Sequence, residues 1–376
     1  MRLLHLSLLN VLLLMTFTLS AQDGETFTDA ETGVTYTVEL VTMANYPVAL
    51  AFTPDGRLFY TEKTTGNVRM ISADGELQTD PVISLPTSAV TERGMLGIAI
   101  DSNYAENGFI WVAHISEPTA RDLPENRIVR FYEQDGVGSD PEIMFAAPLE
   151  NNALIHHGGN LHFDADGYLF YSIGDNELPA NSQDLTTPQG AMHRFEVTDN
   201  GLIPAAGNPF GDDNSIFAYG LRNSFDFDID AETGRIYATE NGQHCDDEIN
   251  LILRGFNYGA GEGYVCGGTA EGVSLGRYLP AILSFTPTEA PTGIIVYDNP
   301  AVPEWQGDLF FCAWNNGLLR RVVLNEARNQ VENVVEIDLG GVQCKIDIEI
   351  APDGSLYFTT VGENTGAIYR IVPIES

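Results

Sequence analysis

The amino-acid sequence predicts an all-β protein, a six-bladed β-propeller with four-stranded antiparallel blades. Two observations support this prediction. One short strand motif recurs six times along the 376 residues, and helical periodicity is almost absent from the chain. Several short strands repeated at intervals of about 50 residues are typical of propellers, in which each repeat forms one blade around a central axis.

Each copy of the motif is a polar residue, a glycine and then an alternating apolar strand. The glycines of the six copies are Gly56, Gly108, Gly167, Gly234, Gly307 and Gly354. Asp-Gly and Asn-Gly between apolar runs favour tight hairpin turns, so a strand is expected on each side of the glycine. The strands expected before the turns cover residues 48–52, 95–100, 159–163, 225–229, 293–297 and 346–350. A last strand near Ile368 is expected to share a blade with residues 36–41 and so close the ring.

The first 21 residues have the pattern of a secretory signal peptide. Met1-Arg2 precedes an apolar run over residues 3–19, and small residues follow at Ser20-Ala21. We expect cleavage near Ala21, which leaves 22–376 as the propeller domain, and the alternative is an uncleaved membrane anchor. No other stretch of the sequence is long and apolar enough to span a bilayer. The mature protein is therefore expected to be secreted or periplasmic.

Charge and cysteine content narrow the function classes. The net charge is −35, and the only lysines are Lys63 and Lys345. Such a negative field repels phosphates, which argues against nucleic acid and anionic membranes as partners.

The four cysteines of an exported chain favour disulfides, because no pair has the C-x-x-C spacing of a metal or redox site. Pairing of neighbours closes the shortest loops, and the other two connectivities stay open. The cysteines are Cys245, Cys266, Cys312 and Cys344.

The repeat also predicts where ionisable groups gather. The first strand of each propeller blade lines the axis, so the residues just before these strands meet at one channel mouth. Those residues are Tyr46-Pro47, Glu92-Arg93, His156-His157, Arg222-Asn223, Pro291-Thr292 and Lys345-Ile346. Two of the seven histidines and one of the two lysines lie on this ring. Ionisable groups at a concave mouth indicate an active site, although polar residues are common in any set of loops.

Four segments of the sequence resemble one known family. They cover residues 92–100, 156–161 with 167–175, 219–224, and 239–250 with 257–259. In this order they are similar to the glucose/sorbosone dehydrogenases, the soluble aldose dehydrogenases that use pyrroloquinoline quinone (PQQ). The resemblance extends over nearly the whole mature chain. Its most specific part is the Asp-Asp-Glu-Ile-Asn run with the Asn-Tyr-Gly that follows.

This resemblance implies a role for several residues of the mouth. His156 would be the general base, since a neutral imidazole can take a hydroxyl proton near pH 7. Arg222 would contact the quinone oxygens and Asn223 would also bind the cofactor. The backbone carbonyls of Gly242 and Gln243 would bind an active-site Ca²⁺, a cation that prefers oxygen ligands. Asp247 would support the turn of Gly242 and Gln243 without binding the metal directly.

The sequence departs from the family where the three carboxylates of PQQ require cationic partners. The family has a lysine and two arginines at the positions that are here Asn315, Cys344 and Ile346. Lys345 and Arg93 lie on the same ring and are expected to replace the family's lysine and arginines. Asn315 is still expected to contact the cofactor. Glu92 occupies a position where the family often has glutamine, and we expect it to contact the cofactor as well.

Three functions follow from these observations. The first is oxidation of an aldose sugar to its lactone, dependent on PQQ and Ca²⁺, with electrons passed to an external acceptor. The second is a non-catalytic Ca²⁺-binding propeller that acts as a binding or interaction module, favoured by the missing cations. A Ca²⁺-dependent lactonase ranks third, because it would need a metal held by carboxylates on the axis.

Overall fold

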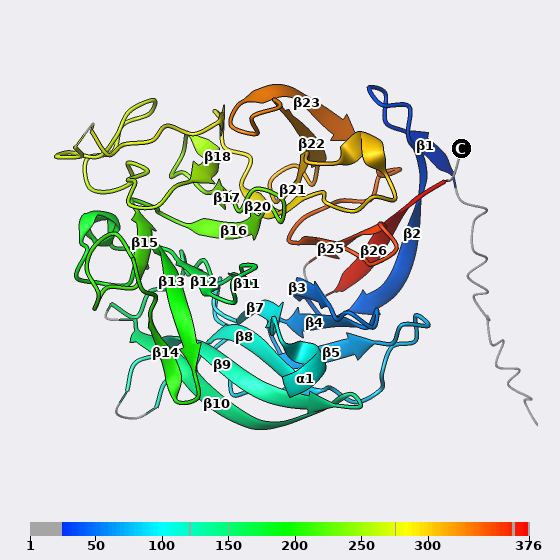
Figure 1. Cartoon of the computed structure of the whole chain (residues 1–376), viewed down its shortest axis with the longest axis horizontal. Coiled ribbons are helices and arrows are strands. Elements are labelled where there is room, and N and C mark those ends of the chain that lie inside the picture. Colours follow the sequence, from blue (N-terminus) through cyan, green and yellow to red (C-terminus); the bar gives the residue numbers. More distant parts are fainter. Residues whose placement is uncertain (1–24, 120–121, 150, 275, 363–364, 375–376) are drawn as a thin grey trace, which may run out of the picture.

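The computed structural model describes residues 25–119, 122–149, 151–274, 276–362 and 365–374. The predicted signal peptide at residues 1–21 lies outside the described residues. Six antiparallel sheets surround a central axis as the blades of a propeller (Figure 1). The predicted fold class is therefore confirmed. No helix in the described part of the chain is long and apolar enough to cross a membrane.

The first three blades follow one another along the chain. The first contains β3 (Pro47–Phe52), β4 (Leu58–Glu62), β5 (Asn67–Ile71) and β6 (Ile83–Ser84). The second contains β7 (Met95–Ile100), β8 (Phe109–Ile115), β9 (Glu125–Gln134) and β10 (Val137–Pro148). The third contains β11 (Leu161–Phe163), β12 (Leu169–Ile173), β13 (Ala191–Thr198) and β14 (Gly201–Pro204), and β15 (Ile216–Tyr219) also pairs with β13. Residues 179–183 form a short 3₁₀ helix beside the third blade.

The remaining blades complete the circle. The fourth contains β16 (Ser224–Ile229), β17 (Ile236–Glu240), β18 (Asp247–Ile252) and β19 (Leu283–Phe285). The fifth contains β20 (Pro291–Val296), β21 (Leu309–Ala313), β22 (Leu319–Leu324) and β23 (Val331–Ile337), with a 3₁₀ turn at Pro303–Trp305. The sixth contains β24 (Ile348–Ile350), β25 (Leu356–Val361), β26 (Gly366–Pro373), β2 (Thr35–Ala44) and β1 (Thr26–Thr28).

The sixth blade joins the two ends of the described chain. β2 pairs antiparallel with β26, from Tyr36 opposite Pro373 to Ala44 opposite Gly366. Figure 1 shows this pair as a blue strand beside a red one. The predicted closure of the ring by the N-terminal strand is confirmed.

The turn glycines adopt the conformation that tight turns require. All six motif glycines have a positive φ, between 64° and 86°, which a residue without Cβ adopts at little cost. The second and fifth copies have antiparallel strands but no tight turn, because α1 (Tyr104–Asn107) precedes Gly108 and a 3₁₀ turn precedes Gly307. The longer connection before Gly108 needs one helical turn, and this glycine caps it in the left-handed conformation.

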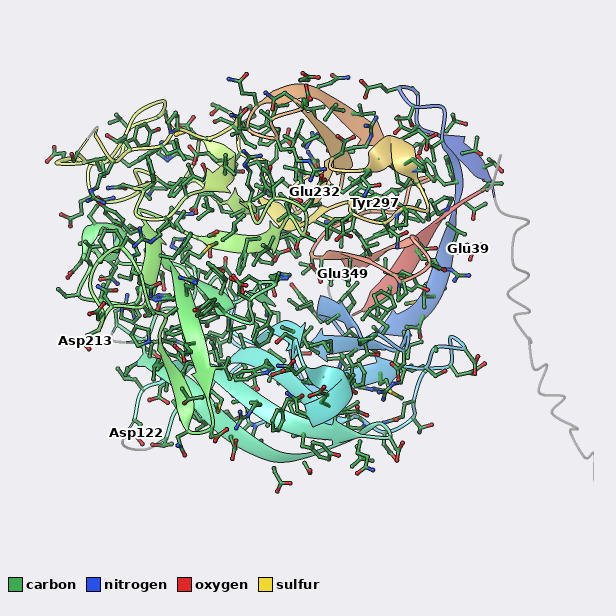
Figure 2. All side chains as sticks on the ribbon, viewed as in Figure 1. Glu39, Asp122, Asp213, Glu232, Tyr297 and Glu349 are labelled. Carbon is green, nitrogen blue, oxygen red and sulfur yellow. A yellow bond between two sulfur atoms is a disulfide. The ribbon has the colours of Figure 1, made fainter. Side chains whose placement is uncertain are left out.

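Apolar residues fill the spaces between neighbouring blades. The second strand of most blades is buried along its whole length, because adjacent blades cover both of its faces. The cluster around Trp111, Leu161 and Tyr171 is one example and joins the second blade to the third. Acidic side chains lie both on the rim, as Glu39 does, and close to the axis, as Glu349 does (Figure 2).

Carboxylates near the axis link the inner strands of neighbouring blades. Oδ2 of Asp226 accepts a hydrogen bond from the Ile294 amide (2.8 Å), and Oδ2 of Asp347 accepts one from the Leu50 amide (2.7 Å). Inner strands have one unpaired edge, so these carboxylates supply acceptors that the sheet does not. They fix the ring of inner strands whose ends form the mouth.

Both disulfides join sequence neighbours. Cys245 pairs with Cys266 and Cys312 pairs with Cys344. The structure therefore selects the pairing with the shortest loops among the three connectivities that the sequence allowed. Each bridge lies at the mouth end of the propeller and constrains loops there.

Candidate active site at the axial mouth

Segments that precede neighbouring inner strands contact one another at one end of the axis. Oε2 of Glu92 accepts a hydrogen bond from the His156 amide (2.7 Å). Oδ1 of Asn223 accepts one from the Gly158 amide (3.1 Å). These bonds cross the boundaries between the second, third and fourth blades. Glu92 and Asn223, both predicted as cofactor contacts, thus also position the loop that presents His156.

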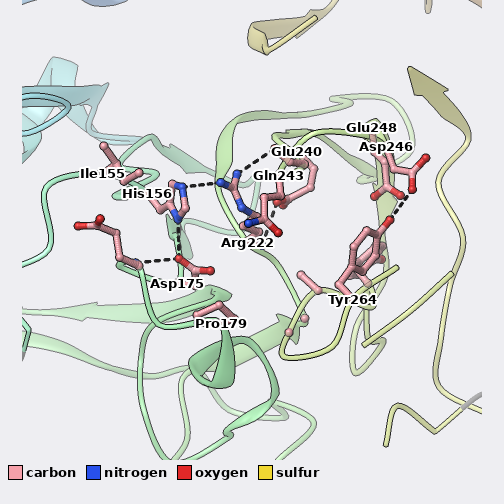
Figure 3. Close-up of a pocket in the computed structure, with 16 residues that line it drawn as sticks. Ile155, His156, Asp175, Pro179, Arg222, Glu240, Gln243, Asp246, Glu248 and Tyr264 are labelled. Atoms are coloured by element: carbon pink, nitrogen blue, oxygen red, sulfur yellow. Dashed lines mark hydrogen bonds and ion pairs between the residues drawn. The ribbon is translucent and has the colours of Figure 1, made fainter. Parts of the chain in front are cut away.

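His156 lies at the centre of a hydrogen-bonded chain. Its Nδ1 is 2.7 Å from Oδ1 of Asp175, and its Nε2 is 2.7 Å from Nη2 of Arg222 (Figure 3). A guanidinium group only donates, so Nε2 is the acceptor and the ring proton lies on Nδ1, facing Asp175. The imidazole is therefore neutral, with its lone pair directed toward Arg222. This is the protonation state that a general base needs.

The backbone around His156 is strained. Its φ is +63°, and Gly158 and Gly159 follow with φ of +57° and +111°. A left-handed conformation costs a residue with a side chain about 1 kcal/mol or more, and such residues cluster at functional sites. Gly174 opposite allows the close approach, because a Cβ there would lie 2.3 Å from the carbonyl oxygen of His156. Asn176 then binds the same carbonyl through Nδ2 (2.8 Å).

His157, the next residue, has a structural role. It is 2 % exposed, and Nδ2 of Asn176 contacts its Nδ1 at 3.3 Å. Burial and the nearby charge of Arg93 lower the pKa of His157 to about 3, so its ring is neutral. His157 therefore faces the interior, whereas His156 lines the cavity.

Arg222 bridges the base and the turn after β17. Its Nη1 donates to the carbonyls of Asn241 (2.7 Å) and Gly242 (3.0 Å). Two carbonyl oxygens therefore converge on one positive group, as they would on a hard metal cation. The sequence predicted the carbonyls of Gly242 and Gln243 for Ca²⁺. In the structure the carbonyl that contacts Arg222 together with that of Gly242 is the carbonyl of Asn241.

A cavity of about 290 Å³ lies between His156 and this turn, near the lower end of the range for small-molecule sites. Five acidic residues and Arg222 are among the residues that line it. The acidic residues are Asp175, Glu177, Glu240, Asp246 and Glu248 (Figure 3). Hydrogen-bond acceptors in this number suit a ligand with many hydroxyl groups.

Two of these carboxyl groups have strongly shifted pKa values. Glu240 and Glu248 face each other on β17 and β18. Burial raises the pKa of Glu240 to about 8 and that of Glu248 to about 7. Each is therefore protonated for a large fraction of the time near neutral pH. Oε1 of Glu240 accepts the amides of Arg222 (2.9 Å) and Asn223 (2.7 Å), so this side chain fixes the start of β16.

Two loops form the outer wall of the cavity. Nδ2 of Asn257 donates to Oε1 of Gln183 (2.7 Å), and Gln183 also donates to the Ala260 carbonyl. The Cys245–Cys266 disulfide attaches the loop after residue 259 to the Gly242 turn. Residues from both loops line the cavity, among them Pro179 and Tyr264.

Asp247 connects the cavity to the fifth blade. Its Oδ1 accepts the Gly242 amide (2.8 Å), and its Oδ2 accepts the amides of Glu289 and Ala290 (both 2.6 Å). The side chain is almost fully buried, and burial raises its pKa. Asp247 thus holds the Gly242 turn against the segment before the fifth blade.

Other predicted cofactor contacts lie farther from His156. Arg93 donates to the carbonyls of Ala153 (2.8 Å) and Asn152 (2.6 Å), so its guanidinium holds the loop before His156. Asn315 is exposed on the turn after β21, and its Nδ2 donates to the Thr288 carbonyl (3.0 Å). Lys345 is half-buried at the mouth. Cys344 and Ile346 occupy the positions of the two family arginines, and both are buried. Cys344 forms a disulfide, and Ile346 packs in an apolar cluster.

No role was predicted for Asp175 or Glu240, although both lie within the segments that resemble the family. Asp175 lies two residues after the end of β12, and Glu240 is the last residue of β17. β12 and β17 are each the second strand of their blade. The second strand of each blade runs toward the mouth. An acidic residue at the end of such a strand is therefore the sequence signal that could have placed Asp175 and Glu240 in the site. Glu62 stands at the corresponding end of β4.

Fold and site together define a six-bladed propeller with a histidine–carboxylate–arginine cluster at its axial mouth. Residues 44–370 match the family model for glucose / sorbosone dehydrogenase. That match spans most of the chain, and the protein belongs to this family.

Three similar proteins illustrate the range of the family. The chain is 27 % identical to aldose sugar dehydrogenase YliI of Escherichia coli, over 88 % of this chain and 90 % of the relative. A solved PQQ-bound aldose sugar dehydrogenase from Streptomyces coelicolor shares the fold, with a TM-score of 0.73 and 24 % identity over 90 % of this chain and 98 % of that one. Mouse Hedgehog-interacting protein is 28 % identical over 49 % of this chain and 30 % of its own length.

The described residues fit the two groups that the family implies, with fewer cations than the resemblance predicted. For Ca²⁺, the carbonyls of Asn241 and Gly242 already converge on a positive group. For the carboxylates of PQQ, Arg222 and Lys345 offer positive charge at the mouth. Among the described residues, the His244, Cys245 and Cys266 group is the one close His/Cys/acidic cluster, and its cysteines form a disulfide.

Proposed function

We propose that the protein oxidises an aldose sugar at its anomeric carbon to the lactone, in a reaction that depends on PQQ and Ca²⁺. The observation that supports this most directly is the neutral His156 in the cavity wall, with Nδ1 bound to Asp175 and Nε2 bound to Arg222. Family membership and the PQQ-bound relative from Streptomyces support the same reaction.

His156 is the general base of the proposed reaction. Nε2 accepts one hydrogen bond, so the anomeric hydroxyl replaces Arg222 as its donor. The O–H and C1–H bonds break as the C1=O bond forms, and the proton passes to Nε2. When bound, the quinone supplies the acceptor for the hydride. Asp175 then stabilises the imidazolium and holds its orientation, as the carboxylate of a catalytic triad does.

Arg222, Gly242 and Gln243 prepare the other side of the site. The guanidinium of Arg222 would offer donors to an oxygen of the bound quinone. The carbonyls of the turn, with Gly242 and Gln243 as the predicted ligands, would hold Ca²⁺. Glu92, Arg93, Asn223, Asn315 and Lys345 are proposed as further contacts to the cofactor or supports of its site.

The acidic cavity favours a neutral, polyhydroxylated substrate. Acidic side chains form hydrogen bonds with sugar hydroxyls, and those that are ionised repel acidic sugars. Two loops form the outer wall of the cavity, one containing Gln183 and the other containing Ala260, and a hydrogen bond between these two residues joins them. The two loops determine the shape of the wall. We propose that they determine which aldose is used.

Export of the protein is also proposed. Residues 1–21 have the pattern of a signal peptide, and both cysteine pairs are joined as disulfides, which persist in oxidising compartments. A secreted or periplasmic enzyme of this type passes its electrons to an external acceptor.

The experiment is reconstitution of the purified protein with PQQ and Ca²⁺, followed by dye reduction with a panel of aldoses. We expect sugar-dependent reduction that is lost in His156→Ala. His162→Gln is the matched control, because His162 lies on the inner strand that follows and outside the cavity. Equal activity of His156→Ala and wild type would contradict the proposal, as would failure of the wild type to bind PQQ.

A non-catalytic Ca²⁺-binding propeller is the second candidate. Its specific support is the replacement of three family cations by Asn315, Cys344 and Ile346, together with the acidic cavity. Hedgehog-interacting protein, a partial relative, bears the name of a binding protein. Titration of PQQ by calorimetry separates the two candidates, because Ca²⁺ binding without PQQ binding supports the second.

A further inference from the structure

An exposed tryptophan and a lysine form a pair at the mouth, between the fifth and sixth blades. Trp314 lies on the turn between β21 and β22 and is 38 % exposed. Nζ of Lys345, in the segment before β24, is 5.2 Å from the centre of its indole ring. The chain's other tryptophans, Trp111 and Trp305, are fully buried in blade cores. Lys63, the other lysine, is buried and donates to the Thr91 carbonyl (2.6 Å).

The pair is held in place by covalent and backbone bonds. The Cys312–Cys344 disulfide joins the strand two residues before Trp314 to the residue just before Lys345. The amide of Cys344 donates to the Gly317 carbonyl (2.9 Å), at the end of the same turn. Lys345 itself donates its amide to Thr359 (3.0 Å). Both side chains therefore extend from fixed backbone positions, which reduces the entropy lost when a ligand binds.

The same pair is connected to the proposed metal turn. The Trp314 amide donates to the Ala290 carbonyl (2.8 Å), and the Ala290 amide donates to Asp247. Asp247 in turn accepts the Gly242 amide. One buried carboxylate thus fixes the Trp314 turn and the Gly242 turn relative to each other, as a ligand that contacts both would need.

We propose that Trp314 and Lys345 form a subsite for the carboxylate-bearing planar ring of PQQ, replacing the cations that the family has at the positions of Asn315, Cys344 and Ile346. The ammonium pairs with a ring carboxylate, and the indole offers a planar surface for the conjugated ring. In a chain of net charge −35, this lysine is one of few positive groups that an anion meets at the mouth. The inference rests on the proposed function and names residues that its cofactor contacts.

The test is calorimetric titration of PQQ into the full-length protein with saturating Ca²⁺ and no sugar. We expect Lys345→Met to raise the Kd for PQQ about tenfold or more, since a charged hydrogen bond is lost. Trp314→Ala should weaken binding in the same direction, and Lys345→Arg should keep most of it. Arg370→Met is the matched control, because it removes one positive charge from an outer strand of the same blade, where Arg370 pairs with Glu39.

Tryptophan fluorescence gives a second readout that does not depend on activity. Because Trp111 and Trp305 are buried, acrylamide quenching reports mainly on Trp314, and PQQ should protect it. Trp314→Phe gives the baseline and keeps a ring, so it also controls for folding.

The outcomes separate this inference from the proposed function. If the wild type binds PQQ and oxidises aldoses while Lys345→Met and Trp314→Ala bind PQQ normally, only the subsite is wrong. It is equally wrong if the variants raise the KM for sugar and leave the Kd for PQQ unchanged, because Trp314 would then contact the sugar. If the wild type binds no PQQ, the proposed function fails and the subsite with it.

Discussion

Nη2 of Arg222 lies 2.7 Å from Nε2 of His156, so a permanent cation donates to the proposed base. The same guanidinium donates to the Gly242 carbonyl through Nη1. Arg222 therefore contacts the proton acceptor and the proposed metal turn at once. Ligands that occupy either position must compete with it, which couples substrate binding to the arrangement of the turn.

Replacement of Arg222 tests this coupling. Lysine keeps the charge but presents one ammonium in place of the planar fork, so it cannot bridge His156 and the turn in the same way. We expect Arg222→Lys to lower kcat/KM for the aldose by about 10²-fold, the usual cost of one donor to developing negative charge. Steady-state dye reduction measures this. A variant within twofold of wild type would contradict the role of Arg222.

Asp175 is expected to position His156 rather than to contact the substrate. An amide in Asp175→Asn can donate to Nδ1 and so favour the tautomer with its proton on Nε2, which cannot accept one from the substrate. We expect kcat to fall about 10²–10³-fold, with a smaller change in the KM for sugar. The pH profile distinguishes positioning from a purely structural effect, because its limb for His156 should move. Unchanged PQQ binding in the same variant would show that the mouth remains folded.

The Cys245–Cys266 disulfide is expected to maintain the wall of the cavity. It closes a 21-residue separation between the Gly242 turn and the loop that bears Tyr264. Tyr264 also donates to Asp246 (2.8 Å), so the loop keeps one polar attachment after the bridge is removed. We expect the double variant Cys245→Ser, Cys266→Ser to lose about 3 kcal/mol of stability or less and to raise the KM for sugar more than it lowers kcat. Thermal unfolding and kinetics measure the two effects, and an unchanged KM would argue against this role.

Glu349 near the axis should make stability depend on pH. Burial and the charge of Asp228 raise its pKa from 4.5 to about 8, while His162 opposes the shift. The folded state therefore prefers the protonated carboxyl group. Its contribution to stability is fully present below pH 4.5 and is lost as the pH rises through about 8.

The variant Glu349→Gln isolates this effect. Glutamine resembles the protonated acid at every pH, so the variant should be more stable than wild type above pH 8, by about 1–3 kcal/mol after allowance for partial exposure. Below pH 4.5 the two proteins should differ little. Urea denaturation at several pH values is the measurement. A variant that is less stable than wild type at pH 9 would contradict the sign of the predicted shift.

The repeated motif was sufficient to predict the propeller because each copy satisfies local rules. A glycine with positive φ turns the chain, and alternating apolar residues form the strands on both sides. The same rules did not predict the longer connections before Gly108 and Gly307, although the strands on both sides of each connection pair as expected. The length of a connection does not specify its conformation. Closure by the strand near Tyr36 was predictable because the last blade lacked a strand.

The site was predictable only in part, since its geometry depends on contacts between blades. His156 and Arg222 were found through their motifs, and the structure brings them within hydrogen-bonding distance. Asp175 was missed although it follows a second strand, because its contact with a histidine 19 residues away depends on how the loops of the mouth fold. Trp314 was missed for a similar reason, because its exposure and its contact with Lys345 arise only when the fifth and sixth blades meet.

Tyr36 tests whether the N-terminal strand holds the ring closed. Its side chain is fully buried in β2, its hydroxyl donates to the Asp338 carbonyl (3.0 Å), and its ring lies 6.2 Å from that of Trp305 in the fifth blade. Tyr36→Ala removes the ring from a core shared by the last two blades, so we expect a loss of about 3–5 kcal/mol in the free energy of unfolding. Tyr36→Phe removes only the hydroxyl and should cost about 1 kcal/mol. Urea denaturation followed by circular dichroism measures both variants. If the two variants lose equal stability, the hydroxyl rather than packing of the ring would fix this strand, and closure would depend on one hydrogen bond.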